Sequence, residues 1–173
     1  MFDPLNEYFD GLVVRSFEEF TRYFMKPHDE FCVICRYQYS SLETVSLAYE
    51  LTAKAVWEIG DCLLVLEEAE QFLDSQNRES FLNYLISFGR HRKISLIGIG
   101  RRPVELAIRL RAAFTSIVSF KQTEPNDIRY LEALGFNAEE VTSLELYEYA
   151  VKGEPIDSKT EEAKQTPGEP EGA

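Results

Sequence analysis

The sequence predicts an α/β fold in which a mostly parallel sheet lies between layers of helices. Strand-like and helix-like segments alternate along the 173 residues, which is the order expected of parallel strands joined by helices. Four of the strand-like segments are nearly continuous apolar runs, without the polar alternation of a strand that has one face in water. With 45% hydrophobic and 28% charged residues, the chain is globular and large enough for a core.

The first half of the chain contains two predicted helices. A helix over 17–25 follows from aromatic residues at helical spacing, with Ser16 as its N-cap. A longer helix over 40–59 carries apolar residues on one face. The strands predicted between and beside these helices are 12–15, 30–37 and 62–67.

The second half continues the alternation. A helix over 78–89 ends at a glycine, one over 103–111 begins with a proline, and one over 124–135 has an early proline and a terminal glycine. The strands predicted here are 94–100, 114–120 and 147–151. We therefore expect one α/β domain over 1–152.

The remaining residues, 153–173, are expected to form a disordered acidic tail, because they are rich in Glu, Lys, Pro and Gly and cannot bury enough apolar surface to offset their ordering entropy. The net charge of −12 argues against a protein that coats nucleic acid by bulk attraction, although the region 89–112 is locally basic. No apolar run approaches the roughly 18 residues of a membrane span, and no signal peptide is visible. We expect a soluble, cytoplasmic protein whose three cysteines are reduced, with Cys32 and Cys35 buried in the core.

Charged residues follow several predicted strands directly. Glu67 and Glu68 close one strand, Arg101 and Arg102 follow another, and Asp3 follows Met1–Phe2 if these residues end a strand. The carboxyl ends of parallel strands share one edge of the sheet, so acids and arginines would meet there, as in a metal–phosphate site. Two plainer interpretations stay open. The acids can simply run out into solvent, and the arginines can form a solvated basic face that pairs with nearby acids.

Four stretches in order resemble the HerA/FtsK-type branch of P-loop ATPases over about residues 1–150: FDPLNEY, LLVLEEAEQFL, FGRHRKISLIGIGRRP and IVSFKQTEPNDIRYLEALG. Members of this branch drive DNA through rings, and relatives occur among phage packaging ATPases. The resemblance implies a RecA-like P-loop fold, ATP and magnesium as cofactors, a homo- or hetero-oligomeric ring, and DNA as a possible partner.

The resemblance also implies catalytic roles for three residues. LLVLEE is similar to the Walker B segment, so Glu67 would hold magnesium through water and Glu68 would orient and activate the attacking water. Gly89–Arg90 is similar to the GR motif, whose arginine can reach the nucleotide of a neighbouring subunit. We therefore expect Arg90 to lie exposed near the carboxyl-terminal rim of the strands.

Four further residues would lie near the nucleotide. Asp3 and Glu7 belong to a stretch similar to the acidic turn that closes the family's second strand. ISLIGIGRRP resembles the strand that normally ends in TQRP, so Arg101 replaces the glutamine that senses the γ-phosphate, and Arg102 stands beside it. This replacement is a departure from the family pattern.

The family's phosphate loop, G-x-x-x-x-G-K-[ST], does not occur in the sequence. The resemblance then implies the carboxyl-terminal portion of an ATPase domain that lacks the first strand, the phosphate loop and the following helix, and that is inactive alone. The alternatives are a non-catalytic ring or scaffold subunit and an unrelated α/β binding module. An empty strand position inside a sheet is costly, so we expect it to close by re-pairing or to be filled by another chain.

Overall fold

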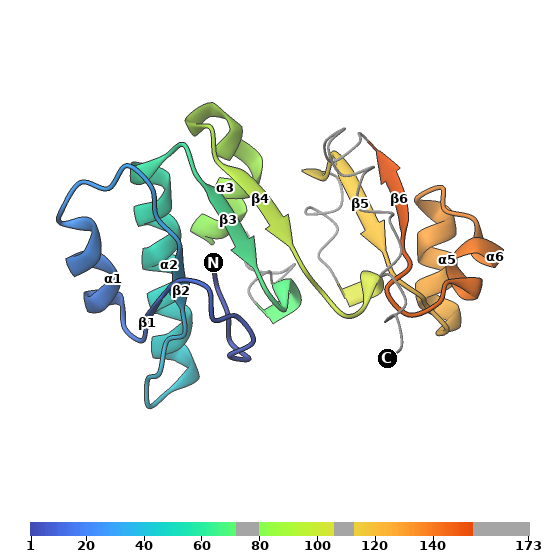
Figure 1. Cartoon of the computed structure of the whole chain (residues 1–173), viewed down its shortest axis with the longest axis horizontal. Coiled ribbons are helices and arrows are strands. Elements are labelled where there is room, and N and C mark those ends of the chain that lie inside the picture. Colours follow the sequence, from blue (N-terminus) through green and yellow to red (C-terminus); the bar gives the residue numbers. More distant parts are fainter. Residues whose placement is uncertain (72–79, 106–112, 154–173) are drawn as a thin grey trace, which may run out of the picture. The chain divides into compact units, whose positions relative to one another are not determined.

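The computed structural model describes residues 1–71, 80–105 and 113–153, and the chain divides into two compact units, Met1–Ala113 and Phe114–Ala173 (Figure 1). Most of the helix predicted at 103–111 lies outside the described residues, and its described part, Pro103–Glu105, is a 3-10 turn. The predicted tail lies outside them from residue 154 onward. None of the described helices is long and apolar enough to cross a membrane.

The first unit contains a parallel sheet, as predicted. Phe2 forms parallel bridges to Cys35 on one side and Leu66 on the other, so Met1–Asp3 act as a short strand inside this sheet. The strand order is therefore β1, β2, Met1–Asp3, β3, β4. The labelled strands are β1 (Leu12–Val14), β2 (Val33–Cys35), β3 (Leu63–Leu66) and β4 (Ser95–Gly98).

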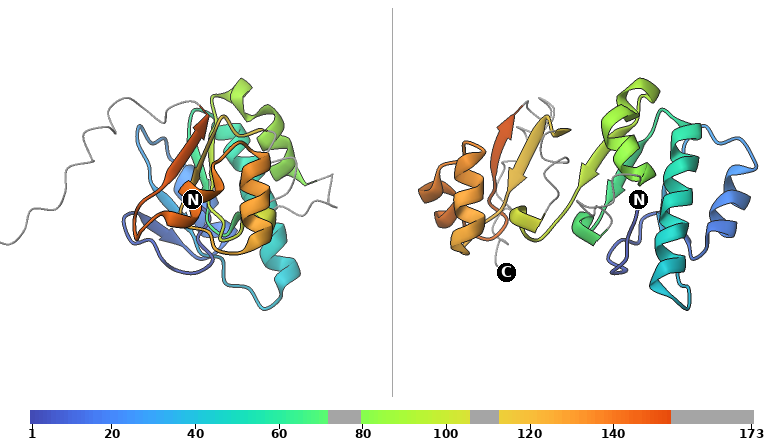
Figure 2. Two further views of the ribbon diagram at one scale, coloured as in Figure 1. Left: turned by 90° about the vertical axis from the view of Figure 1, so that its right-hand side faces the viewer. Right: turned by 180° about the vertical axis from the view of Figure 1, so that it is seen from behind.

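Of the three α-helices among the described residues of this unit, α2 and α3 lie on the same side of the strands (Figures 1 and 2). Phe2 packs its ring against Tyr49 of α2, with 4.6 Å between the ring centroids, which identifies the face of the sheet that the helices cover. On the opposite face Leu63 and Ile97 are 53% and 45% exposed. The described residues of this unit thus contain one of the two predicted helix layers. The helices are α1 (Phe17–Phe24), α2 (Leu42–Ile59) and α3 (Phe81–Phe88).

Local sequence signals explain where these helices begin and end. The Ser16 side chain accepts a hydrogen bond from the backbone of Glu19 at 3.1 Å, which confirms the predicted N-cap of α1. Ser41 caps α2 in the same way through Thr44. Gly60 ends α2 with a φ of +63°, a conformation that costs glycine little.

In the second unit, the described residues 114–153 pack two helices on an antiparallel strand pair. Its core consists of Leu131, Phe136, Val141, Leu144 and Ala150. The last strand begins at Ala150, not at 147 as predicted, because residues 145–148 form a turn in which Tyr147 has a φ of +68°. The elements are β5 (Ser116–Ser119), α5 (Pro125–Ala133), α6 (Ala138–Ser143) and β6 (Ala150–Gly153).

The expected burial of the cysteines needs one correction. Cys35 is buried and Cys62 is half-buried, but Cys32 is exposed, because β2 is shorter than predicted and begins only at Val33.

The outer edge of β4 has no partner strand among the described residues. There β4 pairs with β3 alone and β5 pairs with β6 alone, so the expected re-pairing does not occupy this edge.

Candidate functional site

Asp3 organises the carboxyl-terminal end of the short strand at Met1–Asp3. Its fully buried carboxylate accepts hydrogen bonds from the backbone of Glu7 at 3.1 Å and Tyr8 at 3.3 Å, and from Nε of Arg36 at 2.8 Å. Burial by itself would raise the pKa of Asp3. The backbone donor of Glu7 and the Arg36 guanidinium outweigh burial and hold the pKa below its ordinary value. Asp3 is therefore a charged anchor for the loop that follows it.

This anchored loop places the hydroxyl of Tyr8 against Glu67, the first acid of the predicted site. The Tyr8 hydroxyl donates to Oε2 of Glu67 at 2.8 Å, and Arg36 supports Tyr8 from the other side by donating to its carbonyl. Glu67 is only 7% exposed. The hydrogen bond to Glu67 is the main reason that the pKa of Tyr8 is raised to about 12, so this hydroxyl stays protonated.

After the end of β3, the backbone at Glu68 adopts a left-handed conformation, with a φ of +53°. Its carboxylate is held by Arg101, whose Nη2 and Nε lie 2.7 and 3.0 Å from Oε2 of Glu68. The strand pairing explains this contact, because the ladder between β3 and β4 continues through Ile99 to Leu66 and Ala69. Glu68 is 3% exposed, whereas the Arg101 side chain is 72% exposed.

A third acid, Glu70, stands beside this pair and was not predicted from the sequence. Burial, together with the neighbouring Glu68 carboxylate, raises the pKa of Glu70. Its Oε2 atom is buried and has no hydrogen-bond partner within the described residues. The described part of the chain contains no group of three or more His, Cys, Asp or Glu residues that could hold a metal by themselves. A magnesium ion here would need ligands from phosphate and water as well, which is its usual habit.

Arg90 is exposed, as predicted, but it lies at the opposite edge of the sheet from Glu68. It belongs to the turn Gly89–Arg92 that precedes β4, whereas Glu68 follows the carboxyl end of the parallel strand β3. The expectation of a place at the carboxyl-terminal rim was wrong, because α3 runs back along the sheet and ends at the amino edge.

The other predicted residues have ordinary partners. Arg102 pairs with Glu105 at 3.4 Å. The Glu7 side chain is exposed, and the Glu7 backbone N–H donates a hydrogen bond to Asp3. Lys93 pairs with Asp61 at 3.8 Å, and Arg92 donates to the last carbonyls of α2. Pairing with nearby acids, the plainer interpretation of the basic segment, thus holds for Lys93, Arg101 and Arg102.

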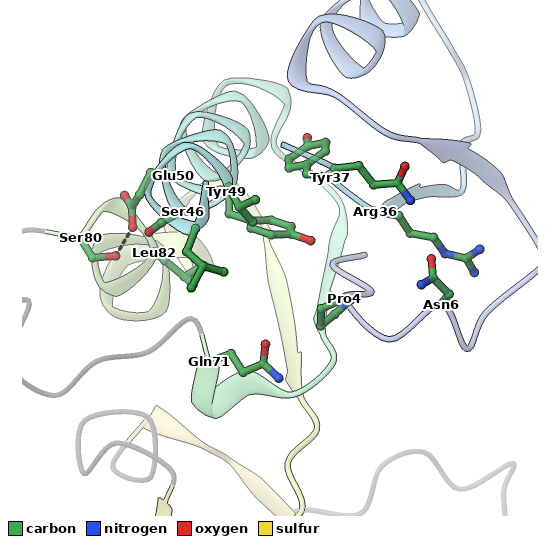
Figure 3. Close-up of a pocket in the computed structure, with 13 residues that line it drawn as sticks. Pro4, Asn6, Arg36, Tyr37, Ser46, Tyr49, Glu50, Gln71, Ser80 and Leu82 are labelled. Atoms are coloured by element: carbon green, nitrogen blue, oxygen red, sulfur yellow. Dashed lines mark hydrogen bonds between the residues drawn. The ribbon is translucent and has the colours of Figure 1, made fainter. Parts of the chain in front are cut away.

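A cavity of about 640 Å³ opens beside the anchored loop, between the ends of Met1–Asp3 and β2 on one side and α2 on the other (Figure 3). Asn6 and Arg36 lie at one end of it, and Tyr49 of α2 projects toward its centre. Glu50 at the far wall accepts hydrogen bonds from Ser80 and from the backbone of Phe81. Neither Glu67 nor Glu68 lines this cavity, so it is separate from the two acids.

The site therefore brings together six side chains from four neighbouring strand ends. Four of them were expected at this rim: Asp3, Glu67, Glu68 and Arg101. The two that sequence reasoning missed, Tyr8 and Arg36, each carried a weak signal. Tyr8 lies in the FDPLNEY stretch, and Arg36 directly follows the apolar run of β2.

No protein-family model and no curated protein sequence matches the chain. Solved structures do match. The genome packaging NTPase B204 from Sulfolobus turreted icosahedral virus 2, in complex with AMPPCP, is 19% identical with a TM-score of 0.63, and in complex with sulfate it is 20% identical with a TM-score of 0.64. Each match covers 88% of this chain and 74% of that chain.

A further match is B204, the DNA-packaging ATPase from Sulfolobus turreted icosahedral virus, at 22% identity and a TM-score of 0.54, covering 70% of this chain and 61% of that chain. At these identities the matches establish the fold. The chain shares the α/β fold of these packaging NTPases.

Proposed function

We propose that this chain is the carboxyl-terminal portion of an ATPase domain of the HerA/FtsK type, which uses ATP to move or package DNA. The observation that carries the proposal is the arrangement at the ends of β3 and β4. Two consecutive buried acids leave one strand, and an arginine from the adjacent strand reaches the second acid. The shared fold with a viral genome packaging NTPase supports the same assignment.

In this proposal each acid has its own task. Glu67 holds magnesium through water, and Glu68 orients the attacking water and takes its proton. Arg101 pairs with Glu68 in the absence of nucleotide and turns to the terminal phosphate when nucleotide is present. Arg90, exposed at the opposite edge of the sheet, acts on the nucleotide of a neighbouring subunit in a ring. DNA is the transported polymer.

The described residues do not fit a triphosphate by themselves. Phosphates in this class are held by successive backbone N–H groups, a helix N-terminus and a lysine of the phosphate loop, and the sequence has no such loop. We propose that a strand carrying this loop pairs with β4. The outward edge of β4, at Leu96 and Gly98, has no partner strand among the described residues of the first unit.

A second candidate function is a non-catalytic ring or scaffold subunit. One observation favours it. Both acids are satisfied within the chain, Glu67 by Tyr8 and Glu68 by Arg101, as expected of a site that has become structural. In that case the fold and the exposed arginine would be retained for assembly alone.

ATP turnover and calorimetric ATP binding separate the two candidates. The purified chain alone should bind ATP more weakly than micromolar and should not hydrolyse it. The same chain preceded by a strand, phosphate loop and helix from a packaging NTPase should hydrolyse ATP. In that extended protein, Glu68→Gln should lower turnover by roughly 100-fold or more, because it removes the proton acceptor.

Glu132→Gln is the matched control, because Glu132 is exposed in the second unit. No turnover by the extended protein, or turnover that Glu68→Gln does not change, would favour the scaffold subunit. Tight binding of ATP by the chain alone would contradict the need for a separate phosphate loop.

A further inference from the structure

The cavity of about 640 Å³ beside the anchored loop lies where ligands of parallel sheets bind. It opens at the carboxyl ends of Met1–Asp3 and β2, against the first half of α2 (Figure 3). Small-molecule sites typically have volumes of about 300–1,000 Å³, and this cavity falls within that range. Since neither Glu67 nor Glu68 lines it, a ligand here would be separate from the proposed magnesium and ATP site.

The inner wall of the cavity is apolar and fixed in position. Val45 lines it from α2 and Leu82 from α3. Tyr49 extends from α2 toward the centre (Figure 3). The Tyr49 ring also contacts the rings of Phe2 and Tyr37, with centroid distances of 4.6 and 4.9 Å, so its position is set by the core. This wall suits the flat, largely apolar body of a ring system.

Three side-chain amides from separate segments line the same cavity. Asn6 belongs to the anchored loop, Gln38 follows β2, and Gln71 lies in the 3-10 turn after β3. Figure 3 shows Asn6 and Gln71 reaching the cavity from these different segments. None of the three amides forms a hydrogen bond with the described part of the chain. Each offers N–H donors beside a carbonyl acceptor, so together they can bind a ligand edge on which donors and acceptors alternate.

The charged residues that line the cavity already have partners within the chain. Arg36 donates to Asp3 at 2.8 Å and to the Tyr8 carbonyl. Glu50 accepts hydrogen bonds from the Ser80 hydroxyl and the Phe81 N–H. The described lining residues include no lysine and no second arginine, so a phosphate or carboxylate would find no free cation there. The cavity therefore favours a neutral ligand.

We propose that this cavity, the amide pocket formed by Asn6, Gln38 and Gln71 around Tyr49, binds a neutral purine nucleoside through its base. Side-chain amides pair with adenine by donating to N7 and accepting from the 6-amino group, which matches the groups offered here. The purine rings would pack against the apolar wall, and the ribose would face solvent. This inference does not rest on the proposed ATPase function.

Calorimetric titration of the chain with three purine compounds tests the proposed chemistry. Adenosine should bind with a Kd of about 0.1 mM, as expected for a ligand of this size. Purine riboside, which lacks the 6-amino group, should bind roughly tenfold more weakly, because it loses a hydrogen bond to an amide. AMP should bind no more tightly than adenosine, because its phosphate gains no cation.

Two pairs of variants locate the binding. Ser46→Phe inserts a large side chain into the pocket from an exposed position on α2 and should abolish binding of adenosine. Leu47→Phe is its matched control, since Leu47 is 57% exposed on the same helix and does not line the cavity. Gln38→Leu should weaken binding several-fold, whereas Gln122→Leu, which removes an amide outside the pocket, should not.

Several results would overturn the proposal. The absence of binding at millimolar adenosine would show that the cavity holds solvent only. Binding that survives Ser46→Phe, or equal affinities for adenosine and purine riboside, would exclude recognition by the amides. AMP binding tenfold tighter than adenosine would indicate a phosphate site instead. If Ser46→Phe does not fold, as judged from its Tm beside that of Leu47→Phe, the comparison of Gln38→Leu with Gln122→Leu decides alone.

Discussion

Arg101 binds a single oxygen of Glu68 with two of its nitrogens, Nη2 at 2.7 Å and Nε at 3.0 Å. The arginine is mostly exposed and the glutamate is almost completely buried, so the guanidinium covers the acid from the solvent side. Oε2 of Glu68 is therefore engaged by the guanidinium and cannot at the same time take a proton from water. Catalytic use of this oxygen requires that Arg101 first moves to another anion.

Removing this cover should make Glu68 chemically accessible. We expect Arg101→Gln to increase the carbodiimide-dependent labelling of Glu68 several-fold, measured by peptide mass spectrometry, while Glu67 stays protected by Tyr8. Arg102→Gln is the control, because Arg102 pairs with Glu105 and not with Glu68. Equal labelling of Glu68 in the wild type and in Arg101→Gln would contradict the contact.

The ion pair of Asp3 and Arg36 should be a large contributor to stability. Asp3 is fully buried and the Arg36 side chain is 9% exposed, so removing one charge leaves the other buried without its partner. We expect Asp3→Asn to lower the free energy of unfolding by about 3 kcal/mol, measured by urea denaturation. Glu7→Gln should have almost no effect, because only the backbone of Glu7 contacts Asp3. A loss below 1 kcal/mol for Asp3→Asn would show that the pair is not stabilising.

The same carboxylate predicts how stability depends on pH. The pKa of Asp3 is lower in the folded chain than its ordinary value of 3.8, so its contribution is complete above about pH 4 and is lost as the pH falls through the folded pKa. The stability difference between the wild type and Asp3→Asn should therefore narrow as the pH is lowered below about 4. The measurement is the urea midpoint of both proteins from neutral to acid pH. A difference in midpoint that stays constant over this range would show that the Asp3 carboxylate is not charged in the folded chain.

Tyr8 should stabilise the fold through its hydroxyl. We expect Tyr8→Phe to cost about 1–3 kcal/mol, because it leaves the nearly buried Glu67 carboxylate without this donor. The pKa of Tyr8, raised from 10.0 to about 12, means that this contribution is complete below pH 10 and is lost as the pH rises through about 12. Denaturation at neutral pH measures the cost, and a phenolate absorbance titration measures the pKa. Tyr147→Phe, at a side chain 84% exposed, should be neutral.

Much of the fold follows from local signals in the sequence. The N-cap of α1 and the apolar runs of the parallel strands are local features, and both were predicted. The glycine that ends α2, Gly60, is an equally local signal, but it was not among the predictions. The lengths of the strands were overestimated, because an apolar run does not indicate where ladder pairing ends. The position of Met1–Asp3 between β2 and β3 could not be predicted, since two partner strands more than 30 residues away determine it.

The candidate site was predictable only where strand order did not matter. Glu67, Glu68 and Arg101 follow directly from the ends of their own strands. The contact of Tyr8 with Glu67 joins residues 59 positions apart, and that of Arg36 with Asp3 spans 33, so both depend on which strands are neighbours. Arg90 was placed at the wrong edge because a motif specifies its residue type but not the direction in which α3 runs.

At position 68 the left-handed backbone favours glycine, whereas the proposed chemistry requires a carboxylate. A φ of +53° costs a residue with a side chain on the order of 1–3 kcal/mol, and glycine or asparagine adopts it more readily. A random mutation to glycine would thus relieve the backbone while it destroyed the carboxylate. In a lineage that no longer used this acid, drift would be expected to replace it early. Position 68 is therefore an indicator of selection, and related sequences that have lost the glutamate there should also have lost the arginine at 101.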